Sequence, residues 1–120
     1  MTKHFTKSEL YCKCGCGMLP ESDFMQKIEA LRVEAGFPFP VSGAARCPKH
    51  NAKVSRTGLA GPHTTGRAID ITVSRAKGYR LLVLACKAGF TGIGLNQKGD
   101  GRFIHLDDLE TPARPAIWSY

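Results

Sequence analysis

Two histidines and one aspartate in this 120-residue chain form a possible ligand set for a divalent metal ion. His63 and Asp70 lie in the segment HTTGRAID, and His105 lies far downstream in the segment FIHLD. The spacing of the first pair differs from that of helical metal ligands, which are about three or four residues apart. A catalytic zinc ion uses three such protein groups and leaves its fourth position to water. The residue types therefore predict a zinc site at His63, Asp70 and His105.

The segment around Asp70 predicts a strand that presents its carboxylate on one face of a sheet. Residues 68–73 are rich in β-branched side chains and follow a Gly-rich loop at residues 55–66. Successive side chains of a strand point to opposite faces, so we expect Asp70 on one face and Ile69 and Ile71 on the other.

Hydrolysis also requires a group that takes a proton from water and passes it to the leaving amine. A second strand is predicted at residues 102–107, and Asp107 shares a face with His105 because side chains two residues apart point the same way. Asp107 could therefore shuttle the proton, or it could accept the N–H of a ligand histidine and fix the tautomer of that ring. Asp100 and Asp108 are weaker candidates for the base.

These residues resemble a known family, the zinc D-Ala-D-Ala carboxypeptidases and L-alanyl-D-glutamate peptidases of peptidase family M15. HTTGRAID resembles the family signature H-x-x-G-x-A-x-D, and His105 resembles its third ligand. Three further segments are similar to those of short members, including phage endolysins: Tyr11–Gly17, Ser42–Asn51 and Arg114–Tyr120. The resemblance implies a zinc peptidase with the fold that this family shares with the hedgehog signalling domain.

The resemblance also assigns roles near the zinc ion. It places Arg46 beside the metal, where a planar guanidinium could hold a substrate carboxylate or polarise the scissile carbonyl. Ser42 would support that loop or contact the substrate. The chain departs from the usual pattern in two ways. Gly61 replaces a common Ser or Thr before the first ligand, and Arg102 and Phe103 stand where an acid or a histidine usually precedes the last one. His4 is expected at the surface and His50 in a structural role.

The remaining pattern predicts an α+β fold with a small antiparallel sheet and helices packed on it, in one domain over residues 1–120. Helices are predicted at residues 21–36, from Pro48 to about Val54, and from an N-cap at Ser74 to Gly89. Strands are predicted at residues 41–46 and 91–96, the latter joined to residues 102–107 by a hairpin turn. The last long helix should bury Tyr79, Leu82, Val83 and Cys86, and Trp118 and Tyr120 should close the core rather than line a groove.

Five cysteines leave several pairings open. Cys12, Cys14 and Cys16 alternate within the Cys- and Gly-rich segment 1–20, and Cys47 belongs to the Ser42–Asn51 segment. If the first segment is extended, its three thiols share one face, and Cys47 or His50 could complete a second, structural metal site. Free, partly buried thiols and a single disulfide are the alternatives.

Composition narrows the choice of partners. Seventeen Lys and Arg against ten Asp and Glu give a net charge of +7, which favours polyanions such as the acidic bacterial wall. The basic residues are scattered and no nucleic-acid-binding motif is present, so no nucleic-acid partner is expected. No apolar run approaches the roughly 20 residues needed to span a membrane, and no secretory signal is visible. We therefore expect a protein without a membrane anchor that is made in the cytoplasm and acts on the wall after release. We also expect a monomer.

The sequence thus favours a zinc metallopeptidase that cleaves peptidoglycan stem peptides or cross-links. A D-Ala-containing bond is the first choice, and an L-Ala–D-Glu bond is the second. The alternative is a zinc-stabilised binding module of the same fold without catalysis, which the departure upstream of His105 keeps open.

Overall fold

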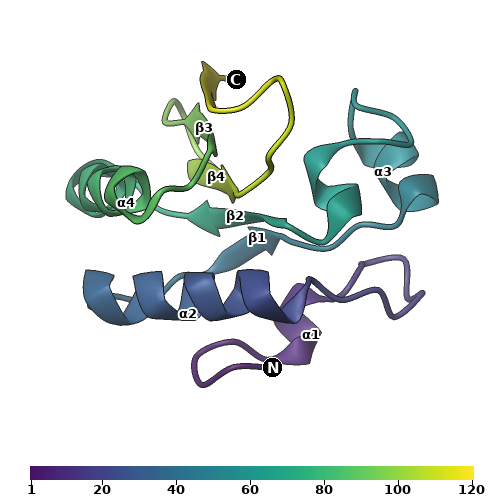
Figure 1. The fold of residues 1–120 in the computed structure, drawn as a ribbon, viewed down its shortest axis with the longest axis horizontal. Helices are drawn as coiled ribbons and strands as arrows, with labels where there is room; N and C mark the ends of the chain where they lie inside the picture. The colour runs from purple at the N-terminus through teal and green to yellow at the C-terminus, as the bar shows by residue number, and fades with distance from the viewer.

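The computed structural model describes residues 1–120 as a five-stranded sheet with helices packed against it, which confirms the α+β class (Figure 1). The helices are α1 (Lys7–Leu10), α2 (Ser22–Ala35), α3 (Pro48–Val54) and α4 (Arg75–Ala88), and a 3₁₀ turn, η1, spans Pro62–Thr65. The strands are β1 (Val41–Gly43), β2 (Ala68–Thr72), β3 (Gly92–Asn96), β4 (Phe103–Asp107) and β5 (Ala116–Ser119). None of the helices combines the length and apolarity that a membrane span requires.

The sheet is mixed rather than purely antiparallel. Its strand order is β1-β2-β4-β3-β5, and only the outer pair, β3 and β5, is parallel. The predicted antiparallel sheet is wrong at this edge because β5 pairs with β3 instead of its sequence neighbour β4. Residues 108–115 carry the chain past β3, so β5 runs opposite to β4 and therefore along β3.

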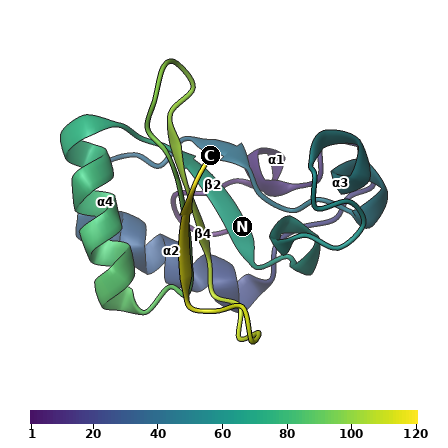
Figure 2. The ribbon, with the colours of Figure 1, turned by 90° about the horizontal axis from the view of Figure 1, so that it is seen from above.

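One face of the sheet forms the apolar core, which α2 and α4 cover (Figures 1 and 2). Alternation along the strands puts the aliphatic side chains on this face and leaves the polar ones on the other. The core strand residues are Ile69 and Ile71 of β2, Ile93 of β3, and Ile104 and Leu106 of β4. The prediction that Asp70 and the two isoleucines of β2 point to opposite faces agrees with this burial.

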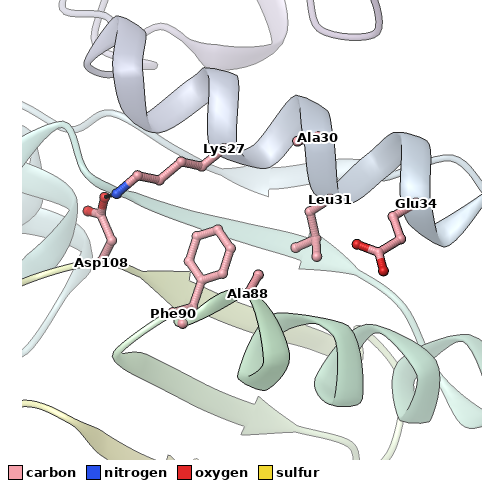
Figure 3. A pocket seen from close by; sticks show the side chains of 8 residues that line it. Lys27, Ala30, Leu31, Glu34, Ala88, Phe90 and Asp108 are labelled. Carbon is pink, nitrogen blue, oxygen red and sulfur yellow. Dashed lines mark hydrogen bonds and ion pairs between the residues drawn. The ribbon is translucent and has the colours of Figure 1, made fainter.

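Between α2 and α4 the surface has a hollow of about 280 Å³ (Figure 3). Leu31 and Phe90 form its floor, and an ion pair between Lys27 and Asp108, 2.8 Å long, closes one end. The hollow lies on the helical side of the molecule. It shares no residue with the cavity on the opposite, polar face of the sheet.

Helix α4 follows the predicted bounds but buries a different stripe. Gly78, Leu81, Leu84 and Ala85 face the core, while the Tyr79 residue is 73% exposed. Val83 and Cys86 are also exposed, so the predicted buried face was wrong and Leu82 is only partly buried. Residues 81–84 are all apolar. Helical periodicity therefore does not single out one face of this helix, and contact with α2 decides it.

The segment after β1 leaves the sheet earlier than predicted. β1 ends at Gly43, and the next backbone donors bond elsewhere: Ala45 N–H donates to Leu10 at 3.2 Å and Arg46 N–H to the carbonyl of His63 at 3.2 Å. These two bonds bring the N-terminal segment and η1 together beside the polar face of the sheet.

Candidate metal centre

Strand register sets Asp70 directly opposite His105. Asp70 of β2 pairs with His105 of β4, and the same cross-strand row continues to Gly43 on one side and to Gly94 and Trp118 on the other. All these positions belong to the polar face of the sheet, opposite the core. The antiparallel pairing alone therefore brings together two of the three predicted ligands, which are 35 residues apart in sequence.

His63 reaches the same place from η1. Its Nδ1–H donates to the carbonyl of Ala44 at 2.7 Å, and its Nε2 lies 3.3 Å from Oδ2 of Asp70. This backbone contact fixes the tautomer, because a proton on Nδ1 leaves the lone pair of Nε2 free toward Asp70. His63 is 6% exposed, so the ring is held by packing as well as by the hydrogen bond.

His105 completes the cluster. Its Nδ1 lies 3.0 Å from Oδ1 of Asp70, and its Nε2 lies 2.7 Å from Oδ2 of Asp107. One donor atom from each of His63, Asp70 and His105 falls within 4.8 Å of the others. Two imidazoles and one carboxylate suit zinc, so the donor set and its spacing fit this ion.

Electrostatics keeps Asp70 ionised. Burial alone would raise the pKa of its carboxyl, but hydrogen bonds with His105 and His63 hold that pKa well below its usual range. The pKa of the His105 ring is shifted in the opposite direction. Burial would lower the pKa of this ring, and the hydrogen bonds with Asp107 and Asp70 outweigh burial and raise it. Asp70 is therefore negatively charged at neutral pH, and its charge favours a cation beside it.

Asp107 lies behind His105 and is fully buried. Burial would raise the pKa of its carboxyl, but His105 and Arg114 lower it to about 2. Arg114 donates from Nε to Oδ1 at 3.0 Å and from Nη2 to Oδ2 at 2.9 Å. Asp107 is not among the residues that line the cavity over the cluster. Its position suits the orienting role better than the proton-shuttle role.

The cluster opens into a cavity of about 490 Å³ on the polar face. Asp70 is the only carboxylate in its wall, and Arg46 and Arg114 are the cations. The other lining residues are Val54, Ser55, Thr57, Pro62, His63, Phe103, His105, Trp118 and Tyr120. The cavity thus combines an anionic candidate ligand for a metal with two guanidinium groups that can bind an anionic substrate.

Arg46 is held at the edge of the cluster by a buried amide. Its Nη1 donates to Oδ1 of Asn51 at 3.1 Å, and its Nη2 lies 3.6 Å from Oδ2 of Asp70. Asn51 is itself fixed, because its Nδ2 donates to Thr57 Oγ1 at 2.8 Å and to the carbonyl of Gly58 at 2.6 Å. Sequence reasoning assigned a role to Arg46 but none to Asn51, although Asn51 ends the same Ser42–Asn51 segment that resembles the family.

Aromatic residues at the C-terminus line the cavity rather than close the core. The Trp118 ring lies 5.1 Å from the His105 ring, and the guanidinium of Arg114 lies 5.0 Å from the Trp118 ring. The expected core role of Trp118 and Tyr120 is therefore wrong. The reason is that β5 lies at the sheet edge, where its alternate residues face the polar side.

Other predicted residues lie outside the cavity. Ser42 does not line the cavity. Its Oγ lies 3.5 Å from the backbone carbonyl of Asp70, so it contacts strand β2 instead. Asp108 is bound by Arg67 and Lys27 instead, and Asp100 lies in the hairpin turn. His4 pairs with Glu29. The four cysteines of the predicted second metal site do gather, at a separate place.

Comparison with known proteins agrees with this geometry. A search of curated proteins finds no match to the chain. A family model described as Peptidase M15 matches residues 3–107, a span that contains His63, Asp70 and His105. The match covers well over half of the 120 residues. The chain therefore belongs to the peptidase M15 family.

Proposed function

We propose that this peptidase is zinc-dependent and hydrolyses peptide bonds in bacterial peptidoglycan stem peptides or cross-links. One observation carries the proposal: donor atoms of His63, Asp70 and His105 converge within 4.8 Å in the wall of a cavity that also contains Arg46. Zinc bound by these three residues would polarise the scissile carbonyl and lower the pKa of a water molecule.

The chain's own groups prepare this chemistry. Asp70 contributes a negative charge, and the contacts of His63 with Ala44 and of His105 with Asp107 aim one nitrogen of each ring at the shared site. We assign Asp107 the role of positioning His105, because both of its oxygens are occupied by Arg114 and the ring.

Substrate recognition follows from the charge of the cavity wall. Peptidoglycan stem peptides carry carboxylates close to the bonds that such enzymes cleave. Arg46 presents a planar fork that suits a carboxylate, and Arg114 adds a second positive charge. A D-Ala-containing bond remains our first choice and L-Ala–D-Glu our second; the cavity of about 490 Å³, walled by Trp118 and Tyr120, has room for either. The net charge of +7 favours adsorption to the acidic wall, where a lytic enzyme acts.

Digestion of defined muropeptides tests the proposal. The purified chain is incubated with each muropeptide, with and without a chelator, and mass spectrometry identifies the products. We expect zinc-dependent release of D-Ala or separation of a cross-link, abolished in His63→Ala and retained in His4→Asn, which removes a histidine that pairs with Glu29 away from the cavity. Cleavage between L-Ala and D-Glu would retain the enzyme class and change the bond.

The same experiment separates the binding-module alternative. Asp70, a candidate metal ligand, is the only carboxylate in the cavity wall, so no other carboxylate lies there to act as a general base. This observation favours the binding module. The wild-type chain could bind zinc stoichiometrically, lose that zinc in His63→Ala, and yet release no product from any muropeptide. This result would support a non-catalytic module and overturn the peptidase proposal.

A further inference from the structure

Four thiols gather at the N-terminal end of the molecule, away from the candidate metal centre. Sγ of Cys12 lies 3.4 Å from Sγ of Cys14 and 3.9 Å from Sγ of Cys47, and Sγ of Cys14 lies 3.5 Å from Sγ of Cys47. Cys16 joins them, with all four sulfurs within 4.8 Å of one another. We propose that these four cysteines bind a structural zinc ion as thiolates, at a second site independent of the proposed peptidase function.

The sulfur spacing fits a tetrahedral metal site better than a disulfide. Four sulfurs about 2.3 Å from a tetrahedral zinc ion lie about 3.8 Å from one another. The three pairs among Cys12, Cys14 and Cys47 span 3.4–3.9 Å. A disulfide would require one pair at about 2.05 Å and would leave the other two thiols without a partner. All four cysteines are free thiols here.

A tight turn, and not an extended strand, makes the cysteines converge. Residues 13–16 form a turn in which Gly15 N–H donates to the carbonyl of Cys12 at 3.1 Å. Gly15 and Gly17 both have φ of 86°, a conformation that favours glycine. The segment is therefore not extended, which was the condition considered for a shared face, yet the turn still brings the three thiols to one point. Cys12 N–H then donates to Met18 at 2.9 Å and closes the loop.

Backbone donors around the sulfurs stabilise thiolate charge. Cys47 N–H donates to Sγ of Cys12 at 3.4 Å, and His50 N–H donates to Sγ of Cys47 at 3.4 Å. Hydrogen bonds to the charged form of a ligand favour that form, and zinc binds thiolates rather than thiols. Four deprotonated cysteines and one Zn²⁺ give a closed site with no position for water, which is the arrangement of a structural zinc.

The position of Cys47 gives the site its structural role. Cys47 follows Arg46 in the chain and caps α3, while the other three cysteines belong to the segment after α1. Zinc would fix the N-terminal segment to the loop that presents Arg46 to the cavity. One backbone hydrogen bond, from Ala45 N–H to Leu10, already joins these two segments. The metal would therefore position Arg46 and would take no part in the reaction.

Metal counting on the full chain tests the proposal. We expect two zinc ions per purified chain, one in the double variant Cys14→Ser/Cys16→Ser and one in His63→Ala. Cys86→Ser, which changes an exposed thiol on α4, should retain two. One zinc per wild-type chain, lost in His63→Ala and kept in the double variant, would overturn the second site. One zinc lost in the double variant and kept in His63→Ala would support this site and contradict the proposed catalytic one.

A second measurement covers the case in which the double variant fails to fold. The His63→Ala chain is stripped of zinc under reducing conditions and loaded with Co²⁺. Thiolate ligation should give an intense sulfur-to-cobalt charge-transfer absorption, which histidine and carboxylate ligands do not give. Folded His63→Ala that lacks this absorption would overturn the proposal. So would a cysteine pair that still resists alkylation after the freshly purified chain is denatured with a chelator and without a reductant, because that pair would be a disulfide.

Discussion

Asp107 accepts a hydrogen bond from Nε2 of His105 at 2.7 Å, which leaves Nδ1 of that ring facing Asp70. The carboxylate is fully buried and held by Arg114, which supports the proposed role of positioning the ring rather than contacting a substrate. We expect Asp107→Asn to weaken zinc affinity by about 10- to 100-fold, as loss of such an orienting contact typically does. Zinc titration against a competing chelator measures the change, with Asp100→Asn in the hairpin turn as the control.

The kinetics of the same variant distinguish positioning from proton transfer. With zinc saturating, Asp107→Asn should keep a kcat within about tenfold of wild type, because in our proposal this carboxylate orients the ring and transfers no catalytic proton. Unchanged zinc affinity together with a kcat lowered by about 10³-fold would instead make Asp107 the proton shuttle.

We expect position 92 to tolerate no side chain, because Asp107 lies opposite Gly92 on the neighbouring strand β4. Gly92 pairs with Asp107, and a Cβ at position 92 would collide with the Asp107 carboxylate. We expect Gly92→Ala to displace that carboxylate from His105 and lower zinc affinity, as Asp107→Asn does. Gly78→Ala on α4 is the matched control, because the nearest atom to a Cβ there is the end of the Gln97 side chain, 3.3 Å away. Equal zinc affinity in both variants would contradict this view of the β3–β4 pair.

Arg46 should need its guanidinium and not only its charge. Arg46→Lys keeps the positive charge but loses the planar fork and the geometry set by Asn51. We expect kcat/KM on a muropeptide to fall by about 10²-fold with zinc content unchanged. Steady-state kinetics and metal analysis provide the test, with Arg102→Lys on the hairpin as the control. Wild-type kcat/KM in Arg46→Lys would remove this residue from substrate recognition.

Zinc affinity should weaken in mild acid. In the metal-free chain the pKa of His105 is raised above its ordinary value, because the contacts with Asp107 and Asp70 outweigh burial. Zinc requires the neutral ring, so protons compete as the pH falls through this raised pKa, which lies above about 6.5. Competition titrations between pH 8 and pH 5.5 should show affinity already falling near neutrality. Affinity constant down to pH 6 would contradict the raised pKa.

A separate ion cluster should contribute stability that depends on pH. Asp108 accepts hydrogen bonds from Arg67 and Lys27, and Arg67 also binds Asp23. Burial would raise the pKa of Asp108, but Arg67 and Lys27 lower it. A lowered folded-state pKa gives stability that is present above the ordinary pKa, near 4, and is lost as the pH falls through the folded value.

The variant Asp108→Asn should therefore lower the free energy of unfolding by about 2 kcal/mol at pH 7, and by less below about pH 4. Urea unfolding at pH 7 and pH 3 measures the difference, and Asp100→Asn again serves as the control. A deficit of the same size at both pH values would show that the charge of Asp108 is not the cause.

Local patterns were enough to predict β2, β3 and β4 and the faces that β2 and β4 present, but they did not predict β5. In β2 and β4 the large aliphatic residues occupy every second position, so the sides on which Ile69, Asp70 and Asp107 lie could be predicted from sequence. The helix bounds followed from equally local signals, such as Gly36 at the end of α2 and Gly89 at the end of α4.

The features that were missed depend on long-range pairing. Arg114 and Trp118 reach the cavity only because residues 108–115 carry β5 past β3, and no local pattern encodes that path. Asn51 supports Arg46 through contacts with a loop that has no regular structure. The buried side of α4 could not be predicted because residues 81–84 are all apolar and contact with α2 selects among them.

The alternation of side chains along β2 and β4 determines both the apolar core and the candidate metal site. Asp70 and His105 lie on the polar face of the sheet only because Ile69, Ile71 and Ile104 face the helices. Inserting or deleting one residue in either strand would exchange the two sets, leaving an isoleucine where the ion should bind and a carboxylate or imidazole in hydrocarbon surroundings. An insertion in the hairpin turn between β3 and β4 leaves this alternation intact, but an insertion or deletion of one residue inside β2 or β4 would destroy stability and activity together.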